Sequence, residues 1–268
     1  MRDIVLMSLI AVLVASCSAA PPAEPPPAAA TDLAPTGRLR AGLNFGNALL
    51  TGKDPATGAP RGVAFDIAQE LGRRLGMPVD VVAYESAGAL ADAASSGAWD
   101  IGFLGAEPQR ASVISFTDAY AEIESTYLVP PGSPLERVED VDRDGVRIAI
   151  AAKSAYDLYL SRTLQHARLE RTDGADAAFA KLVGEKLDAM AGLRPALVGY
   201  AEKLPGSRVL DGRFTTIQQA IGTPVGRDAG AAYLRAFVED IKANGFVAQA
   251  IERNGACGLT VAPAAGTR

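Results

Sequence analysis

The pattern of apolar and polar residues predicts alternating strands and helices from Leu39 onward. Short apolar runs of strand length alternate with longer segments in which apolar residues recur at helical spacing. Strands are expected at 39–43, 79–84, 100–104, 123–129, 146–151, near Arg168, 187–192 and 215–222. Helices are expected at 67–76 with Asp66 as N-cap, at 87–96 with Ser86 as N-cap, from Pro108, from Ala155, through Phe179 and Leu182, and at 228–245.

The order of these elements predicts an α/β fold. Repeated strand–helix–strand units form parallel sheets that carry helices on both faces. The strand at 100–104 is apolar on both faces, as a strand covered on both sides should be. A polar connection at 130–145 separates two such series, which predicts two lobes.

The N-terminal residues resemble a bacterial export signal. An apolar run at 4–15 is shorter than the about 20 residues that a membrane-spanning helix needs, but it suits the core of a signal peptide. The run ends in small residues before Cys17, an arrangement similar to a lipobox, in which the cysteine is lipidated. The sequence therefore predicts a lipoprotein signal peptide at 1–16; the alternative is a secretory peptide cut near Ala19 or Ala20.

A stretch rich in proline and alanine at 17–36 lacks periodicity and is expected to be an extended tether. Residues 261–268 are expected to be a C-terminal tail. If Cys17 carries lipid, Cys257 is the remaining cysteine of the chain, so no disulfide is expected. Beyond residue 36 no segment is apolar enough to cross a membrane, which places the body on the far side of the inner membrane.

The composition excludes several classes of function. The chain is 49% hydrophobic with a net charge of −5, so no nucleic-acid partner is expected. It contains one histidine, His166, and the sequence shows no Ser–His–Asp set, no metal-spaced His/Cys cluster and no phosphate-binding loop. We therefore expect no catalytic residue, no metal and no cofactor.

Five segments together resemble the extracellular solute-binding proteins of family 3, best known as amino-acid receptors of ABC importers. The segments are GRLRAGL, GVAFDIAQELGRRLG, SSGAWDIGF, EPQRASVISFTDAY and IKANGFVAQAI, and the resemblance covers roughly residues 37–258. The resemblance implies a two-lobed periplasmic-binding-protein fold of type II, with two hinge crossings and a cleft between the lobes. It implies that lobe one consists of 37–127 and 219–260, and that lobe two consists of 128–218.

Together with the lipobox-like N-terminus, this resemblance implies a periplasmic, lipid-anchored, monomeric protein. It would capture an amino acid or a related small carboxylate in the cleft and deliver it to an ABC permease in the inner membrane. Two alternatives stay open: a ligand-presenting component of a sensory system, and a dehydratase-like enzyme on the same fold.

Ligands of open α/β sheets bind at the carboxyl ends of the strands, which points to four loops. The first loop follows Leu43 and offers Asn44, Phe45 and Asn47. The resemblance implies that Phe45 forms an aromatic wall of the cleft; the alternative is that it packs into the lobe core.

The second loop follows the strand at 100–104. Its candidate ligand contacts are Leu104, Gly105, Ala106, Glu107 and Arg110. The resemblance implies that Arg110 clamps a ligand carboxylate, with support from the N-terminus of a helix that begins at Pro108. The alternative is a structural ion pair of Arg110 with Glu107 or Asp118.

The third and fourth loops belong to lobe two. In the third loop, Lys153, Ser154, Ala155 and Tyr156 are candidates; Ser154 is expected to cap a helix, and the backbone N–H groups of the next two residues would face the cleft. The fourth loop contributes Gly192 and Arg194. The resemblance implies a carboxylate where Gly192 stands, to bind a ligand ammonium group. We therefore expect an anionic ligand that need not carry an α-amino group.

Overall fold

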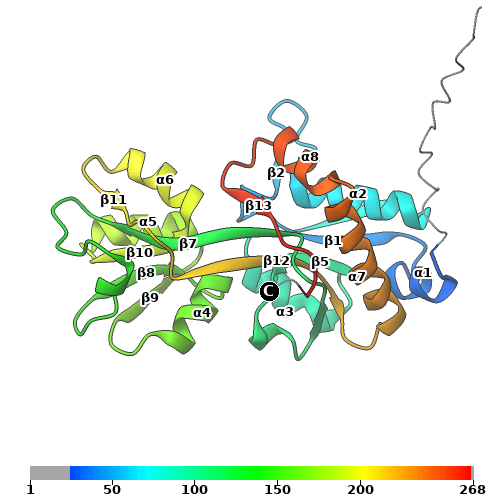
Figure 1. Cartoon of the computed structure of the whole chain (residues 1–268), viewed down its shortest axis with the longest axis horizontal. Coiled ribbons are helices and arrows are strands. Elements are labelled where there is room, and N and C mark those ends of the chain that lie inside the picture. The colour runs from blue at the N-terminus through cyan, green and yellow to red at the C-terminus, as the bar shows by residue number, and fades with distance from the viewer. Residues whose placement is uncertain (1–24, 267–268) are drawn as a thin grey trace, which may run out of the picture.

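The computed structural model describes residues 25–266, which form two α/β lobes side by side (Figure 1). The signal peptide and Cys17 lie outside the described residues. The helices are α1 (Pro27–Leu33), α2 (Val63–Leu75), α3 (Ala87–Asp92), α4 (Ala155–Thr163), α5 (Ala175–Gly184), α6 (Arg194–Lys203), α7 (Asp228–Ala243) and α8 (Phe246–Arg253). The strands are β1 (Leu39–Asn44), β2 (Gly52–Lys53), β3 (Pro60–Arg61), β4 (Val79–Tyr84), β5 (Ile101–Gly105), β6 (Ile114–Phe116), β7 (Ala121–Val129), β8 (Arg147–Ala151), β9 (Arg168–Thr172), β10 (Ala189–Leu193), β11 (Arg208–Val209), β12 (Thr215–Pro224) and β13 (Leu259–Val261).

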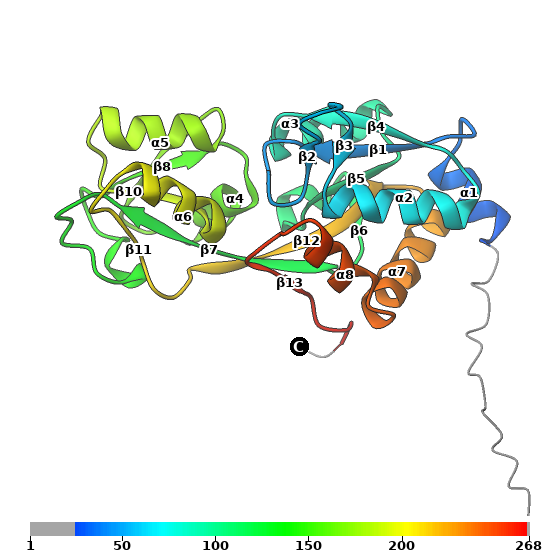
Figure 2. The ribbon, with the colours of Figure 1, turned by 90° about the horizontal axis from the view of Figure 1, so that it is seen from above.

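One continuous sheet joins the two lobes, in the order β4-β1-β5-β12-β7-β10-β8-β9. Strands β4, β1 and β5 are parallel in the first lobe, and β10, β8 and β9 are parallel in the second. Between them, β7 and β12 pair with each other antiparallel and run from one lobe into the other (Figure 2). These two strands are the hinge crossings of the two-lobed periplasmic-binding-protein fold.

Each lobe has its own apolar core. In the first lobe, α2, α7 and α8 pack on the sheet, and the expected apolar face of α7 is buried through Leu234, Phe237, Val238 and Ile241. In the second lobe, apolar residues of α4 pack on one side of the sheet and those of α5 and α6 on the other. Because each core is separate, the lobes can move as bodies about β7 and β12.

The prediction of an extended tether at 17–36 is wrong for its last part, because residues 27–33 form α1. Pro27 occupies the first turn, where its missing N–H costs nothing, and Ala29 and Leu33 lie on one buried face. That face packs against α7, where the Asp32 carboxylate accepts a hydrogen bond from the Gly230 N–H at 2.9 Å. Burial of Leu33 against a distant helix therefore outweighs the disorder that the local composition favours.

Helix α2 and the helix expected from Pro108 also differ from the expectation. Helix α2 begins at Val63 with Gly62 as N-cap, and Asp66 lies inside its first turn, where it accepts hydrogen bonds from Arg253 and Asn254. The helix expected from Pro108 is a single 3₁₀ turn, Pro108–Arg110, too short to offer a helix dipole. In the part of the chain that the structure describes, no helix is both long and apolar enough to span a bilayer.

Candidate functional site

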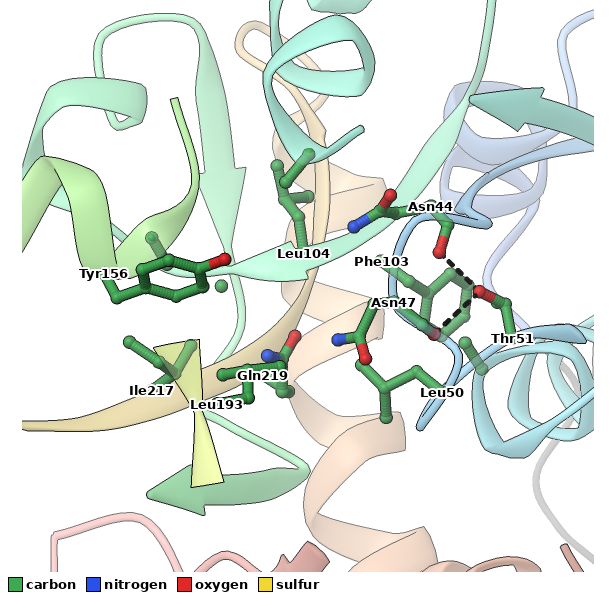
Figure 3. Close-up of a pocket in the computed structure, with 14 residues that line it drawn as sticks. Asn44, Asn47, Leu50, Thr51, Phe103, Leu104, Tyr156, Leu193, Ile217 and Gln219 are labelled. Atoms are coloured by element: carbon green, nitrogen blue, oxygen red, sulfur yellow. Dashed lines mark hydrogen bonds between the residues drawn. The ribbon is translucent and has the colours of Figure 1, made fainter. Parts of the chain in front are cut away.

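The carboxyl ends of strands from both lobes enclose a pocket of about 60 Å³ (Figure 3). The loop after β1, the end of β5 and the first residues of α2 and α3 form the first-lobe wall. Helix α4 and the end of β10 form the second-lobe wall, with β12 between the two walls. The lining residues are Asn44, Asn47, Leu50, Thr51, Ala64, Ala87, Phe103, Leu104, Gly105, Ala155, Tyr156, Leu193, Ile217 and Gln219.

The loop after β1 holds two asparagines in fixed orientations. The Asn44 Oδ1 accepts a hydrogen bond from the Gly46 N–H at 3.0 Å, and the Asn47 Oδ1 accepts one from the Leu49 N–H at 3.2 Å. The Thr51 hydroxyl donates to the backbone carbonyls of both asparagines. Because the amide oxygens are engaged by the backbone, the amide nitrogens are left to point into the pocket, as Figure 3 shows.

The lobes approach each other closely at Gly105, the last residue of β5. A Cβ at this position would lie 2.8 Å from the Ala155 Cβ and 2.9 Å from the Ile217 Cγ2. Real Cβ atoms do not approach other atoms so closely, so glycine is required for this contact between the lobes.

Arg110 is buried behind Gly105 and does not line the pocket. Its guanidinium donates to the Gly105 carbonyl at 2.6 Å and to the Lys153 carbonyl at 2.9 Å, and so ties the first lobe to the second. Burial lowers the pKa of Arg110 to about 10, against the opposing effect of Glu107 and Asp92. Within residues 25–266 it forms no ion pair with Glu107 or Asp118, so the structural ion pair that was the alternative does not form.

Two ion pairs lie beside this tie. Glu107 pairs with Arg162 of α4 at 2.6 Å, and Lys153 pairs with Asp92 at 2.6 Å. We call these two pairs, together with the hydrogen bonds of Arg110, the lobe clasp. Both ion pairs and the hydrogen bond from Arg110 to the Lys153 carbonyl join one lobe to the other, so the strength of the lobe clasp bears on how closely the lobes are held together.

The third loop is built as the sequence predicts. The Ser154 side chain caps α4 by accepting a hydrogen bond from the Asp157 N–H at 3.0 Å, and Ala155 and Tyr156 line the pocket. Figure 3 shows Tyr156 reaching in from the second lobe toward the strand that carries Leu104. Burial raises the pKa of Tyr156 to about 12, so its hydroxyl is neutral.

The fourth loop differs from the expectation by one residue. A Cβ on Gly192 would lie 3.0 Å from the Leu197 Cδ2, which places this side of β10 under α6 and away from the pocket. The next residue, Leu193, lines the pocket instead. Arg194 points to the back of the hinge, where it pairs with Glu124 at 2.9 Å beside a second cavity of about 360 Å³.

The structure thus brings some predicted residues together and leaves others apart. Asn44, Asn47, Leu104, Gly105, Ala155 and Tyr156 line the pocket, whereas Phe45, Ala106, Glu107, Arg110, Lys153, Ser154, Gly192 and Arg194 do not. Phe45 packs against the core of the first lobe and does not form a wall of the pocket, which is the alternative considered for it above. The lining residues that the sequence analysis missed are Leu50, Thr51, Ala64, Ala87, Phe103, Leu193, Ile217 and Gln219. For Ile217 and Gln219 a signal existed, since alternate residues of a hinge strand face the cleft.

A two-lobed fold with a pocket enclosed by both lobes defines a binding protein of the periplasmic type. The sequence model of the bacterial extracellular solute-binding proteins, family 3, matches residues 50–255. The chain belongs to this family. No curated protein sequence matches the chain.

Solved structures share the fold. The cysteine-binding protein from Campylobacter jejuni superposes with a TM-score of 0.73 at 17% identity, over 87% of this chain and 99% of that chain. A mutant of ArgBP from T. maritima gives a TM-score of 0.70 at 20% identity, over 84% of this chain and 98% of that chain. AncCDT-1, an ancestral amino acid-binding protein described as a precursor of cyclohexadienyl dehydratase, gives 0.69 at 22% identity, over 84% and 98%.

Proposed function

We propose that this protein captures a small polar solute between its lobes and delivers it to an ABC permease. The observation that carries the proposal is the interlobe pocket: Asn44, Asn47 and Gln219 come from the first lobe and its hinge strand, and Tyr156 and Leu193 come from the second. A solute bound there would contact both lobes and stabilise their closed arrangement, which a permease can distinguish from the open one.

We further propose that the protein works in the periplasm as a monomer, held to a membrane by a lipid on Cys17. The family is extracellular, which supports export. Helix α1 adds a constraint, since its packing on α7 fixes Pro27 to the first lobe. The proposed tether is therefore shorter than the sequence suggested and ends where α1 begins.

A sensory role would use the same closure of the lobes, with a membrane receptor in place of the permease. A dehydratase-like activity finds a precedent among fold neighbours in AncCDT-1, the precursor of an enzyme. The pocket lining contains no charged side chain that could exchange a proton at neutral pH, so binding without turnover is the function that the geometry supports better.

A thermal-shift screen of the purified full chain with amino acids, organic acids, amides and polyols tests the proposal. A compound that binds the folded state raises the melting temperature, because it adds to the free energy of unfolding. At a concentration a hundredfold above Kd the added free energy is about 2.7 kcal/mol. Leu193→Trp should fill the pocket and abolish the shift. Val198→Trp, an exposed position of α6 in the same lobe, is the matched control and should leave the shift unchanged. If Leu193→Trp keeps the full response, the solute binds elsewhere.

A further inference from the structure

The lining of the interlobe pocket is electrically neutral. None of its fourteen residues is Asp, Glu, Lys, Arg or His. The strong polar groups are three carboxamides and a tyrosine hydroxyl, from Asn44, Asn47, Gln219 and Tyr156. A charged group of a ligand would lose its hydration on entry without meeting an opposite charge on the pocket wall.

The charged side chains nearest the pocket are engaged with other protein groups. Arg110 donates to two backbone carbonyls, and the ammonium of Lys153 pairs with Asp92. The Asp157 carboxylate accepts the Lys153 N–H at 2.7 Å and pairs with Arg171 at 3.0 Å. Glu107 is held by Arg162, so recruitment of any of these charges to a ligand would break the lobe clasp or the start of α4.

The carboxamides offer hydrogen bonds that the protein does not use. The Asn44 and Asn47 oxygens are engaged by backbone N–H groups, which leaves their nitrogens as donors toward the pocket. Gln219 is buried and lines the pocket, and its side-chain amide forms no hydrogen bond among the described residues, so both its oxygen and its nitrogen are available to a ligand. A polar ligand in the pocket could form hydrogen bonds with these amide groups.

The rest of the lining is apolar. Leu50 and Phe103 lie behind the asparagines, and Leu193 and Ile217 close the pocket on the side of the second lobe and the hinge (Figure 3). Ser125 pairs with Leu193 across the sheet and is buried with its hydroxyl unpartnered among the described residues, so it adds no charge beside this wall.

We propose that the pocket selects a small uncharged solute, whose hydrogen-bond acceptors face Asn44 and Asn47 and whose apolar body packs against Leu193 and Ile217. This inference rests on the proposed function, because it names the class of solute that the cleft captures. It departs from the expectation of a carboxylate held by Arg110, and it separates this protein from fold neighbours whose names specify amino acids. A primary amide, a lactam or a diol has the required chemistry, whereas an amino-acid zwitterion brings two unmatched charges.

Binding to matched isosteres tests the inference on the purified full chain. The probes are sets with one carbon skeleton, such as butanamide, butanoate, butylamine and 2-aminobutanoate, extended to longer and cyclic skeletons, with lactams and diols among the uncharged members. Calorimetry should give the uncharged member of each set at least about tenfold tighter binding than any charged member. Tighter binding of the carboxylate or of the amino acid would overturn the inference while leaving the proposed function intact. If no compound of either class binds, the proposed function itself fails.

A charge introduced into the pocket wall provides a second test of the inference. Leu193→Asp places a carboxylate on the pocket wall, and Leu193→Asn places an amide of the same shape there. The Asp variant should bind the amine probes at least about tenfold more tightly than both the wild type and the Asn variant. If the wild type already binds the amines as tightly as the Asp variant does, a counter-charge is present in the native pocket and the inference is wrong.

Discussion

Loss of the Glu107–Arg162 ion pair should weaken ligand binding without unfolding either lobe. The pair joins the loop after β5 to α4 at 2.6 Å, and the Glu107 side chain is 7% exposed while that of Arg162 is 36% exposed. Glu107→Gln keeps the shape of the side chain and removes its charge. Because Arg162 is partly in water, it can be solvated again once the lobes separate, which limits the penalty to the closed state.

The magnitude follows from this partial exposure. Truncating one partner of a fully buried, hydrogen-bonded charge pair costs about 2–5 kcal/mol, whereas an exposed pair contributes about 0–1 kcal/mol. A pair with one buried and one partly exposed member should lie between these values, at about 1–2 kcal/mol. If closure is required for tight binding, Kd should rise roughly 5- to 30-fold, since 1.4 kcal/mol corresponds to about a factor of ten.

Calorimetry with the tightest ligand of the screen measures the change in Kd, and thermal unfolding of the ligand-free protein measures the stability of the lobes. Glu202→Gln, at an exposed position of α6, removes the same charge outside the clasp and should change neither quantity. The double variant Glu107→Gln, Arg162→Gln should cost less than the sum of its two single changes. An unchanged Kd for Glu107→Gln would refute the role of the clasp in closure. A higher Kd would also fail to support that role if the ligand-free protein lost enough stability to explain the weaker binding.

Three further outcomes follow from the structure. Leu33→Ala should destabilise the first lobe by about 2–5 kcal/mol in urea unfolding, because it removes the buried contact of α1 with α7. Burial alone would raise the pKa of Asp100, but hydrogen bonds from Arg40 and Arg227 outweigh it and hold the pKa below the ordinary value. Asp100 therefore contributes stability that is present above about pH 4 and lost as the pH falls through its lowered folded pKa, so Asp100→Asn should flatten this acid dependence in urea titrations. Cys17→Ser should release the protein from the membrane fraction on cell fractionation, and retention with unchanged gel mobility would contradict the lipid anchor.

The sequence predicted those features that depend on local pattern. Ser154 could be recognised as an N-cap because it precedes a helical pattern directly, and the structure confirms its bond to the Asp157 N–H. Asn44, Asn47 and Tyr156 were chosen because ligands of open α/β sheets bind at the carboxyl ends of the strands, and the structure places all three at the pocket. Their contact with a ligand stays a prediction.

Features that depend on register or on distant contacts escaped the sequence analysis. In β10 an offset of one residue exchanges the two faces of the strand, so Gly192 was placed at the pocket where Leu193 belongs. The composition around α1 concealed a helix whose stability comes from α7, far along the chain. The partners of Arg110 are backbone carbonyls of both lobes, which no residue pattern identifies.

The central claim is that a solute binds between the lobes and closes them. Small-angle X-ray scattering of the full chain, with and without a saturating concentration of the tightest ligand, tests this claim most directly. The account predicts a smaller radius of gyration with ligand, because the lobes rotate about β7 and β12 until the pocket walls from both lobes meet the solute. A radius of gyration that stays the same while calorimetry shows full occupancy would contradict it.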